Sequence, residues 1–251
     1  MKISMKSNNQ SMYFLLSIVV CMLALVNPAQ ASNWYWDFSN GLDHNNFTFS
    51  SDRLSDIFLD ESGGNLRIYS NVFGVIPSSV QGGNISSQFK VNGDFEISID
   101  YSLNKALDSG TQVQLGLSNL ALVRSNEPGV GGNNYHVWYP NVIKGLTSTS
   151  DTTGTFRLVR IGSNLASYVN SSLIYNYIDY GSGDMGFGFN VQANGFSGWN
   201  GGRLNATYDN LRVTANALVD FTPSNSVPAP PTIFLIAPFL TFLRSKRGKA
   251  Q

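Results

Sequence analysis

Apolar and polar residues alternate along the stretch 93–103, whose sequence is GDFEISIDYSL. Its apolar members are Phe95, Ile97, Ile99, Tyr101 and Leu103. Successive side chains of a β-strand point to opposite faces of a sheet, so this spacing predicts a strand with one buried face and one wet face.

Similar short runs return through the middle of the chain, separated by Gly, Asn and Ser. They centre on Leu66, Val113, Val137, Leu158, Tyr168, Phe187 and Leu211. Almost nothing in this region has a helical period, and it shows no internal repeat of useful length. We therefore expect an all-β fold in which residues 32–219 form an antiparallel two-sheet β-sandwich.

The dipeptide Asn92-Gly93 stands between two alternating runs and is typical of a tight hairpin. A two-residue turn there would place apolar and acidic side chains on the same face, so the register argues against it. A three-residue loop with Gly93 in the left-handed conformation makes all faces agree. Its predicted pairs are Phe89 with Phe95, Ile85 with Ile99, and Lys90 with Asp94.

Residues 1–31 have the parts of a secretory signal peptide. Two lysines precede an apolar stretch at 12–26, and Ala29 and Ala31 are small residues of the kind that a signal peptidase accepts before its cleavage site. The single cysteine, Cys21, lies in this segment. The mature chain is therefore expected to contain no disulfide and no cysteine-based metal site.

A second apolar run lies at 231–243, after a predicted flexible linker at 220–226. At about 1.5 Å per residue, this run makes a helix of roughly 20 Å, which is short for a hydrocarbon core of about 30 Å. Pro238 in its middle also removes a backbone hydrogen bond. We expect a short hydrophobic helix that holds the protein only transiently at the membrane, with its basic end on the cytoplasmic side.

The segment 227–251 resembles the PEP-CTERM sorting signal in the order of its parts. These parts are Val227, Pro228, Ala229 and Pro230, then the apolar helix, then the basic residues Arg244, Lys246 and Arg247. Ala229 stands where the commonest form has Glu, which bears on the subtype of the processing enzyme. The resemblance implies a Gram-negative bacterium that makes extracellular polysaccharide and an exosortase-type membrane protease as a partner. It also implies export through the inner membrane, transient insertion there, and release to the cell surface or extracellular matrix.

Charge is distributed unevenly, although the formal net charge is zero. Six of the 16 Lys and Arg lie in the two terminal segments, which leaves the predicted sandwich with more Asp and Glu than Lys and Arg. Nucleic-acid affinity depends mainly on neutralising phosphates with clustered cations. We therefore expect no nucleic-acid partner.

Four stretches of the predicted sandwich, taken in order, are similar to the concanavalin A-like lectin and glucanase jelly rolls. They are 36–43 (WDFSNGLD), 93–103, 154–169 (GTFRLVRIGSNLASYV) and 208–213 (YDNLRV). The resemblance implies a jelly roll whose first and last strands lie side by side. Trp36 and Asp37 should then neighbour Asp209 and Asn210.

Glycosidases of this fold resemble one another in a strand with a Glu-x-Asp-x-Glu pattern, because alternation sends its carboxylates into one cleft. The nearest pattern in this chain is Asp94, Glu96 and Asp100, and it is interrupted by Ser98. Solvated charges on an outer sheet face explain these residues more simply. The chain therefore shows no carboxylate constellation that is typical of a glycosidase.

The two histidines, His44 and His136, are far apart in the sequence and stand in polar, Asn-rich stretches. Neither has visible partners for a catalytic triad or a zinc site. Together with the missing carboxylate pattern, this predicts that the protein is not an enzyme.

Two loops, 131–141 and 194–205, have the composition of a sugar site, because sugar rings stack on aromatic faces and polar side chains bind their hydroxyls. Their candidate carbohydrate-binding residues are Trp138, Tyr139, Trp199 and Arg203. Trp199 is the preferred one, because its glycine-rich setting cannot easily bury it. We predict a module that binds extracellular polysaccharide or has a structural role in the matrix. The alternatives are a glycan-active hydrolase with an atypical acid pair and a protein-binding adhesin.

Oxygen-rich turns also offer a candidate site for structural calcium, which prefers oxygen ligands. Asp37, Asp43 and Asp209 would approach one another if the first and last strands pair. Asp side chains also accept backbone hydrogen bonds in caps and turns, so local turn formation is the competing explanation for these residues.

Overall fold

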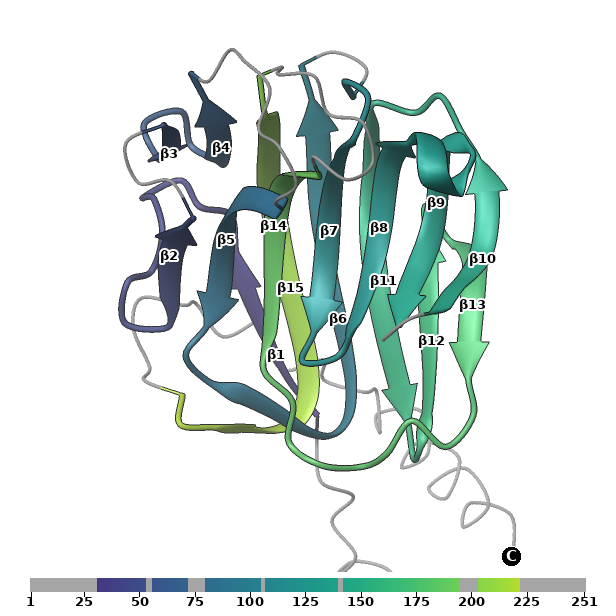
Figure 1. Ribbon diagram of the computed structural model, residues 1–251. Helices are drawn as coiled ribbons and strands as arrows, with labels where there is room; N and C mark the ends of the chain where they lie inside the picture. Colours follow the sequence, from purple (N-terminus) through teal and green to yellow (C-terminus); the bar gives the residue numbers. More distant parts are fainter. Residues whose placement is uncertain are drawn as a thin grey trace, which may run out of the picture.

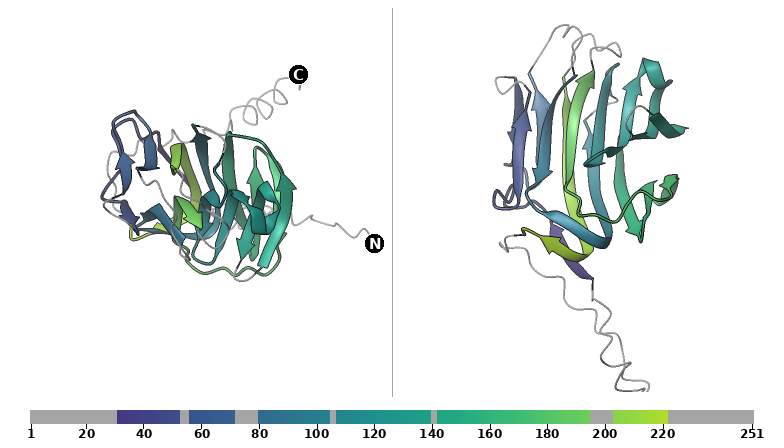
Figure 2. Two further views of the ribbon diagram at one scale, coloured as in Figure 1. Left: turned by 45° about the horizontal axis from the view of Figure 1, so that its top comes forward. Right: turned by 60° about the horizontal axis from the view of Figure 1, so that its bottom comes forward.

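Two antiparallel β-sheets pack face to face, as Figure 1 shows for a computed structural model that describes residues 31–52, 56–71, 80–104, 107–139, 142–194 and 203–221. These residues form strands and one short 3-10 turn, Pro128–Val130. The predicted antiparallel β-sandwich is therefore confirmed. Figure 2 shows the two layers from two further directions.

The first sheet has eight strands, seven of which follow one another in a continuous order. That order is β13 (Ser172–Tyr177), β12 (Asn164–Val169), β11 (Thr153–Ile161), β6 (Lys90–Leu103), β15 (Asn205–Val219), β4 (Leu66–Ser70) and β3 (Ile57–Asp60). The eighth strand, β1 (Ser32–Trp36), also pairs with β15.

The second sheet has seven strands. Their order is β10 (Val142–Ser148), β9 (Gly132–Tyr139), β8 (Leu120–Glu127), β7 (Thr111–Leu117), β14 (Phe187–Asn194), β5 (Val80–Ser87) and β2 (Phe47–Ser51). Strands β7, β8 and β9 follow one another both in the chain and in the sheet, whereas β14 is inserted between β7 and β5. This crossover brings β14 beside segments that are distant in the sequence.

The core lies between the sheets and is built from the alternating apolar positions. On β6, Phe95, Ile97 and Ile99 are buried, as the alternation predicted. On β14, every second residue is buried in the same way. Full burial of an aliphatic or aromatic side chain contributes about 1.5–3 kcal/mol, so these strands hold the two layers together and direct their polar residues outward.

The hairpin predicted around Asn92-Gly93 is wrong. Strand β5 ends at Ser87 in the seven-stranded sheet, and β6 begins at Lys90 in the eight-stranded sheet. The two runs are therefore in different layers, and their residues have other partners: Ile85 pairs with Phe189, and Ile99 pairs with Phe156. Alternation predicts that a run is a strand but does not say which sheet the strand joins.

Gly93 does have a left-handed backbone, with a φ of 67°, but inside a strand. It lies at a β-bulge of β6 where the pairing with β15 is irregular, between Asn92, opposite Ala217, and Phe95, opposite Ala215. Bulges and hairpin turns both use left-handed glycine, so the local signal fits either structure. Asp94 accepts a hydrogen bond from the backbone nitrogen of Gly162 (2.7 Å) instead of facing Lys90.

The first and last strands of the sandwich are neighbours, as the resemblance implied. Trp36 pairs with Leu211, and the hydroxyl of Tyr35 donates a hydrogen bond to the side-chain oxygen of Asn210. Phe221 packs edge-on against Trp36 at the same end of the sandwich. The chain therefore enters and leaves the sandwich at neighbouring places in Figure 1.

Among the residues that the structure describes, no helix combines the length and apolar character needed to cross a bilayer. The predicted signal peptide up to residue 30, most of the linker and the whole sorting segment lie outside the described residues.

Candidate functional site

The outward-facing residues of the seven-stranded sheet form what we call the open face, and its strands place them in rows across the sheet. One row, the amide row, runs over β5, β14, β7, β8 and β9. It consists of Asn84, Asn190, Gln114, Val123 and His136. Three of its five members are carboxamides, which both donate and accept hydrogen bonds.

The rows on either side of the amide row have different compositions. On one side lies the glycine row, which consists of Ser86, Gly188, Gly116, Ala121 and Trp138. On the other side lie Gly82, Gln192, Gln112, Ser125 and Asn134. Beyond this third row, Asn194 ends β14 and Glu127 ends β8.

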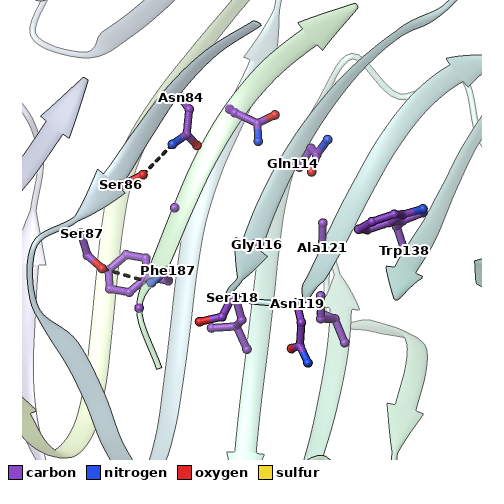
Figure 3. Close-up of a pocket in the computed structure, with 15 residues that line it drawn as sticks. Asn84, Ser86, Ser87, Gln114, Gly116, Ser118, Asn119, Ala121, Trp138 and Phe187 are labelled. Atoms are coloured by element: carbon purple, nitrogen blue, oxygen red, sulfur yellow. Dashed lines mark hydrogen bonds between the residues drawn. The ribbon is translucent and has the colours of Figure 1, made fainter. Parts of the chain in front are cut away.

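The first of two hollows on the open face has a volume of about 390 Å³ and is drawn in Figure 3. We call it the glycine hollow, because its lining includes Gly116 and Gly188, which lie opposite each other in the row next to that of Gln114 and Asn190. A Cβ atom at Gly188 would lie 2.7 Å from the carbonyl oxygen of Ile85, so no larger residue fits there without a shift. The indole of Trp138, which is 46% exposed, lines the hollow from β9.

The second hollow, of about 350 Å³, adjoins the first and shares Gln114 and Trp138 with it. We call it the Glu127 hollow. Its lining includes the amides of Gln112, Gln192 and Asn194 together with Glu127 and His136. The two hollows therefore make one surface that crosses six neighbouring strands, from β5 to β10.

His136 is held in one orientation by Asn134. The amide nitrogen of Asn134 donates to the carbonyl oxygens of Val130 and Gly132, both at 2.8 Å. Its side-chain oxygen therefore faces the Nδ1 atom of His136, at 2.7 Å, and has to accept. The proton consequently resides on Nδ1, and the Nε2 atom carries the lone pair.

Burial keeps this imidazole uncharged. His136 is 2% exposed, and loss of hydration disfavours its charged form, which lowers its pKa to about 4. At neutral pH the ring is a hydrogen-bond acceptor at Nε2 and is not a cation.

Asn190, at the centre of the amide row, has a buried side-chain oxygen that finds no hydrogen-bond partner among the described residues. Its backbone oxygen is used by the hydroxyl of Tyr208 from the opposite layer. Buried polar atoms without a partner are rare in proteins, because each costs about 1–3 kcal/mol. Asn190 also lines the glycine hollow.

The predicted sugar-binding residues lie in different places. Trp138 is on the open face, whereas the ring of Tyr139 points the other way and packs against Tyr177 and Tyr180. Arg203 borders a small hollow beside Leu204, away from both hollows of the open face. Trp199 lies in the segment 195–202, outside the described residues.

The acidic residues considered for catalysis lie on the outer face of the other sheet. Glu96 forms an ion pair with Arg157 (3.2 Å), and Asp100 accepts hydrogen bonds from Thr155 (2.5 Å) and Asn210 (3.0 Å). The Nε2 atom of the exposed His44 lies 3.3 Å from a carboxylate oxygen of Glu61. None of these groups lines either hollow of the open face.

Among the described residues that line the two hollows, Glu127 is the one carboxylate. The neighbouring segments 72–79 and 195–202 contain no Asp or Glu in their sequence. The sequence search missed Glu127, because it looked for acidic residues spaced along a single strand. A polar alternation in β7 and β14, which carries Gln112, Gln114, Asn190, Gln192 and Asn194, was the available signal.

The three aspartates considered for calcium fall in two places. Asp37 and Asp43 line a hollow formed by the loop after β1, and Asp209 lies opposite Asp100 on the eight-stranded sheet. Asp37 accepts a hydrogen bond from the backbone nitrogen of Ser39, which lowers the pKa of that carboxyl. In the part of the chain that the structure describes, no three His, Cys, Asp or Glu residues form a group able to hold a metal. A structural calcium site at these aspartates stays a prediction.

Comparisons with known proteins identify the fold. No family model matches the chain, and no curated protein matches it. Solved structures do match. An endo-acting O-glycanase of the human gut microbiota aligns with a TM-score of 0.55 at 11% identity, over 72% of this chain and 98% of its own. A Bacillus licheniformis β-glucanase aligns with a TM-score of 0.51 at 12% identity, over 73% of this chain and 98% of its own.

A third match is a Bacteroides ovatus GH16 protein in complex with a mixed-linkage glucan product, with a TM-score of 0.51 at 11% identity, over 74% of this chain and 99% of its own. At these identities the matches show the fold, which is the predicted concanavalin A-like jelly roll. They contradict the prediction that the protein is not an enzyme, since these neighbours are glycan hydrolases. That prediction relied on a motif within one strand, whereas the two hollows of the open face are lined from several strands.

Proposed function

We propose that this protein is a glycan-active module that binds a sugar chain across the open face and hydrolyses one of its glycosidic bonds. The observation that carries the proposal is the continuous surface of the two hollows, with carboxamides from three strands beside the exposed indole of Trp138. The glycosidase neighbours support the hydrolytic part, because they share the fold.

Binding follows from the chemistry of the rows. A sugar hydroxyl is both a donor and an acceptor, and so is a carboxamide, so Gln112, Gln114 and Asn190 can each serve hydroxyls in either sense. The apolar face of a sugar ring can lie against the indole of Trp138. Gly116 and Gly188 leave room for such a ring close to the backbone.

Hydrolysis requires a proton donor for the leaving oxygen and a group that takes a proton from the attacking water. We assign the first role to Glu127 and the second to the lone pair of His136 at Nε2. The bond between the anomeric carbon and the glycosidic oxygen breaks as that oxygen receives the proton of Glu127. Water forms the new bond to the anomeric carbon, and its proton passes to His136. The imidazole takes this role because the lining offers no second carboxylate among the described residues.

The test is a panel of polysaccharides and oligosaccharides incubated with the mature protein, in which both binding and the release of reducing ends are measured. Glu127→Gln should lower the rate of release by about 10²–10⁴-fold, the range typical of a lost acid or base, while binding changes little. Glu96→Gln, on the other sheet, is the matched control and should change neither.

Binding without release by the wild-type protein would remove the hydrolytic part of the proposal. Failure to bind any member of the panel would remove the proposal as a whole. Release that survives in Glu127→Gln would reject the assignment of the acid.

We further propose where the module acts. The predicted signal peptide at 1–31 and the resemblance of 227–251 to a sorting signal support export through the inner membrane by way of signal peptidase. An exosortase-type protease would then cut the tail and free the module to the cell surface or the extracellular polysaccharide. Mass spectrometry of the extracellular protein should find an N-terminus at Ser32 and no peptide that contains Arg244. A tail that is still attached in the extracellular protein would contradict this route.

A further inference from the structure

We infer that the open face selects an uncharged, hydroxyl-rich polysaccharide over one that bears carboxylate or sulfate groups. The inference rests on the proposed function, whose substrate class it specifies. It follows from the charges that the face carries, from the amides that it presents, and from the shape of the glycine hollow.

The charges of the open face do not suit an anion. The described residues that line the two hollows include no Lys or Arg, and Glu127 is negative when ionised. In the chain, the segment 72–79 that precedes β5 and the segment 195–202 that follows β14 contain no Lys or Arg. Carboxylate and sulfate groups are normally bound by Arg or Lys, so an acidic sugar would lose hydration here without gaining a charged partner.

Two cations on these strands face the other way. Lys144 lies opposite Val137, whose side chain is buried on the core side of β9. Arg124 is fully buried beneath β8, where its guanidinium donates to the carbonyl oxygens of Asp151 (3.1 Å) and Ser125 (2.6 Å). His136 adds no positive charge near neutral pH, because burial lowers its pKa to about 4.

The amides of the open face offer hydrogen bonds to the hydroxyl groups of a neutral sugar. Gln112 and Gln114 are only 7% and 9% exposed, so little of their hydration would be lost when a ligand covers them. The buried side-chain oxygen of Asn190 finds no donor among the described residues. A hydroxyl hydrogen from a ligand would satisfy this oxygen, whereas a carboxylate or sulfate oxygen has no hydrogen to donate.

The shape of the glycine hollow leads to the same class of ligand. Gly116, Gly188 and Ala121 are consecutive in one row and form a floor of small residues next to the ring of Trp138. An aromatic face carries a negative quadrupole, which favours the C–H face of a sugar and disfavours an anion stacked on it. A flat, neutral sugar ring is therefore the ligand that uses the floor, the indole and the amides together.

The experiment compares matched pairs of ligands. Each neutral oligosaccharide of the panel is paired with the same backbone oxidised at C6 to a uronate, and binding to the mature protein is measured by calorimetry at low and high salt. We expect the neutral members to bind at least about tenfold more tightly, a difference of about 1.4 kcal/mol. Their binding should be insensitive to salt, because no ion pair is formed.

A charge variant tests the same point by gain of function. Gln114→Lys places a cation between the two hollows and should narrow or reverse the preference, with binding of the oxidised member becoming salt-sensitive. Gln112→Lys adds the same charge at a second position of the open face and replaces Gln114→Lys if that variant does not fold. Asn164→Lys, at the exposed first residue of β12, adds the same charge on the other sheet and should leave the preference unchanged.

The outcomes are distinguishable. If the oxidised members bind as tightly as the neutral ones or more tightly, the inference is overturned while the proposed glycan face stands. If neither member of any pair binds, the proposed function itself fails.

Discussion

The outer faces of the two sheets differ in how their polar groups are satisfied. On the eight-stranded sheet the protein supplies its own partners: Arg157 pairs with Glu96 and lies over the ring of Tyr168, 4.3 Å from its centre. On the seven-stranded sheet, carboxamides surround two hollows, and a buried oxygen of Asn190 finds no partner among the described residues. The same fold thus carries one surface with internal ion pairs and one on which amides surround two hollows.

The comparison also bears on the acidic residues that the sequence analysis set aside as solvated charges. Ion pairs on an exposed sheet face contribute only about 0–1 kcal/mol and are common, so Glu96 and Asp100 carry little functional information. An uncharged amide in a hollow is easily overlooked in a sequence. The open face is distinguished by its amides and its two hollows, and charge density is a poor guide to both.

The largest effect that we expect is a loss of stability at acid pH caused by the buried His136. The folded-state pKa of His136 is about 4, below its unfolded value of 6.5, so the unfolded chain binds a proton more readily between these values. The free energy of unfolding should therefore fall by roughly 2–4 kcal/mol as the pH drops from about 6.5 to about 4. Denaturant unfolding across this range measures the loss.

His136→Gln should remove most of that acid loss, whereas His44→Gln, at an exposed position, should keep it. If the free energy of unfolding of His136→Gln fell at acid pH as much as that of the wild-type protein, the assignment of a neutral, buried imidazole would be contradicted.

A smaller effect is expected from the backbone of the glycine hollow. A methyl group at position 188 would meet the carbonyl oxygen of Ile85, so Gly188→Ala should destabilise the fold by about 1–3 kcal/mol and narrow the hollow. Gly183→Ala, where nothing lies within 4 Å of the added carbon, should change stability by less than about 0.5 kcal/mol. Equal stabilities for the two variants would show that the close approach at Gly188 is unimportant.

The next effect compares one aromatic residue from each face. Trp138→Ala should weaken glycan binding about tenfold, the loss of one stacking contact worth about 1.4 kcal/mol, with little change in stability because the ring is 46% exposed. Tyr168→Ala removes a ring that is covered by Arg157 and should leave binding intact. Binding isotherms with one neutral oligosaccharide measure the affinity of both variants. An equal loss of affinity in the two variants would reject the open face as the binding surface.

The smallest effect should come from the ion pair on the other sheet. Arg157→Gln breaks the contact with the half-exposed Glu96 and should lower the free energy of unfolding by less than about 1 kcal/mol, and less still at high salt. A loss of several kcal/mol in thermal unfolding would mean that this face is as highly organised as the open face.

Much of the sandwich could be predicted from local patterns. The alternation in 93–103 became β6, and the likeness of 36–43 and 208–213 to jelly-roll ends anticipated the pairing of Trp36 with Leu211. The bulge at Gly93 could not be told from a hairpin turn, because a left-handed glycine serves a bulge and a turn equally well. The candidate site was only partly visible: Trp138 was among the predicted sugar contacts, whereas Glu127 and the amides were not.

Residue order alone decides which side chains of each strand share a face, because the period of a strand is two. It therefore already separated Trp138 from Tyr139 and grouped Gln112 with Gln114. Only the tertiary structure decided that Asn190 lies beside Gln114 and that Glu127 closes the same surface. The reason is that β14 enters the sheet between β7 and β5, and pairing between strands so distant in the chain depends on the packing of the whole sandwich.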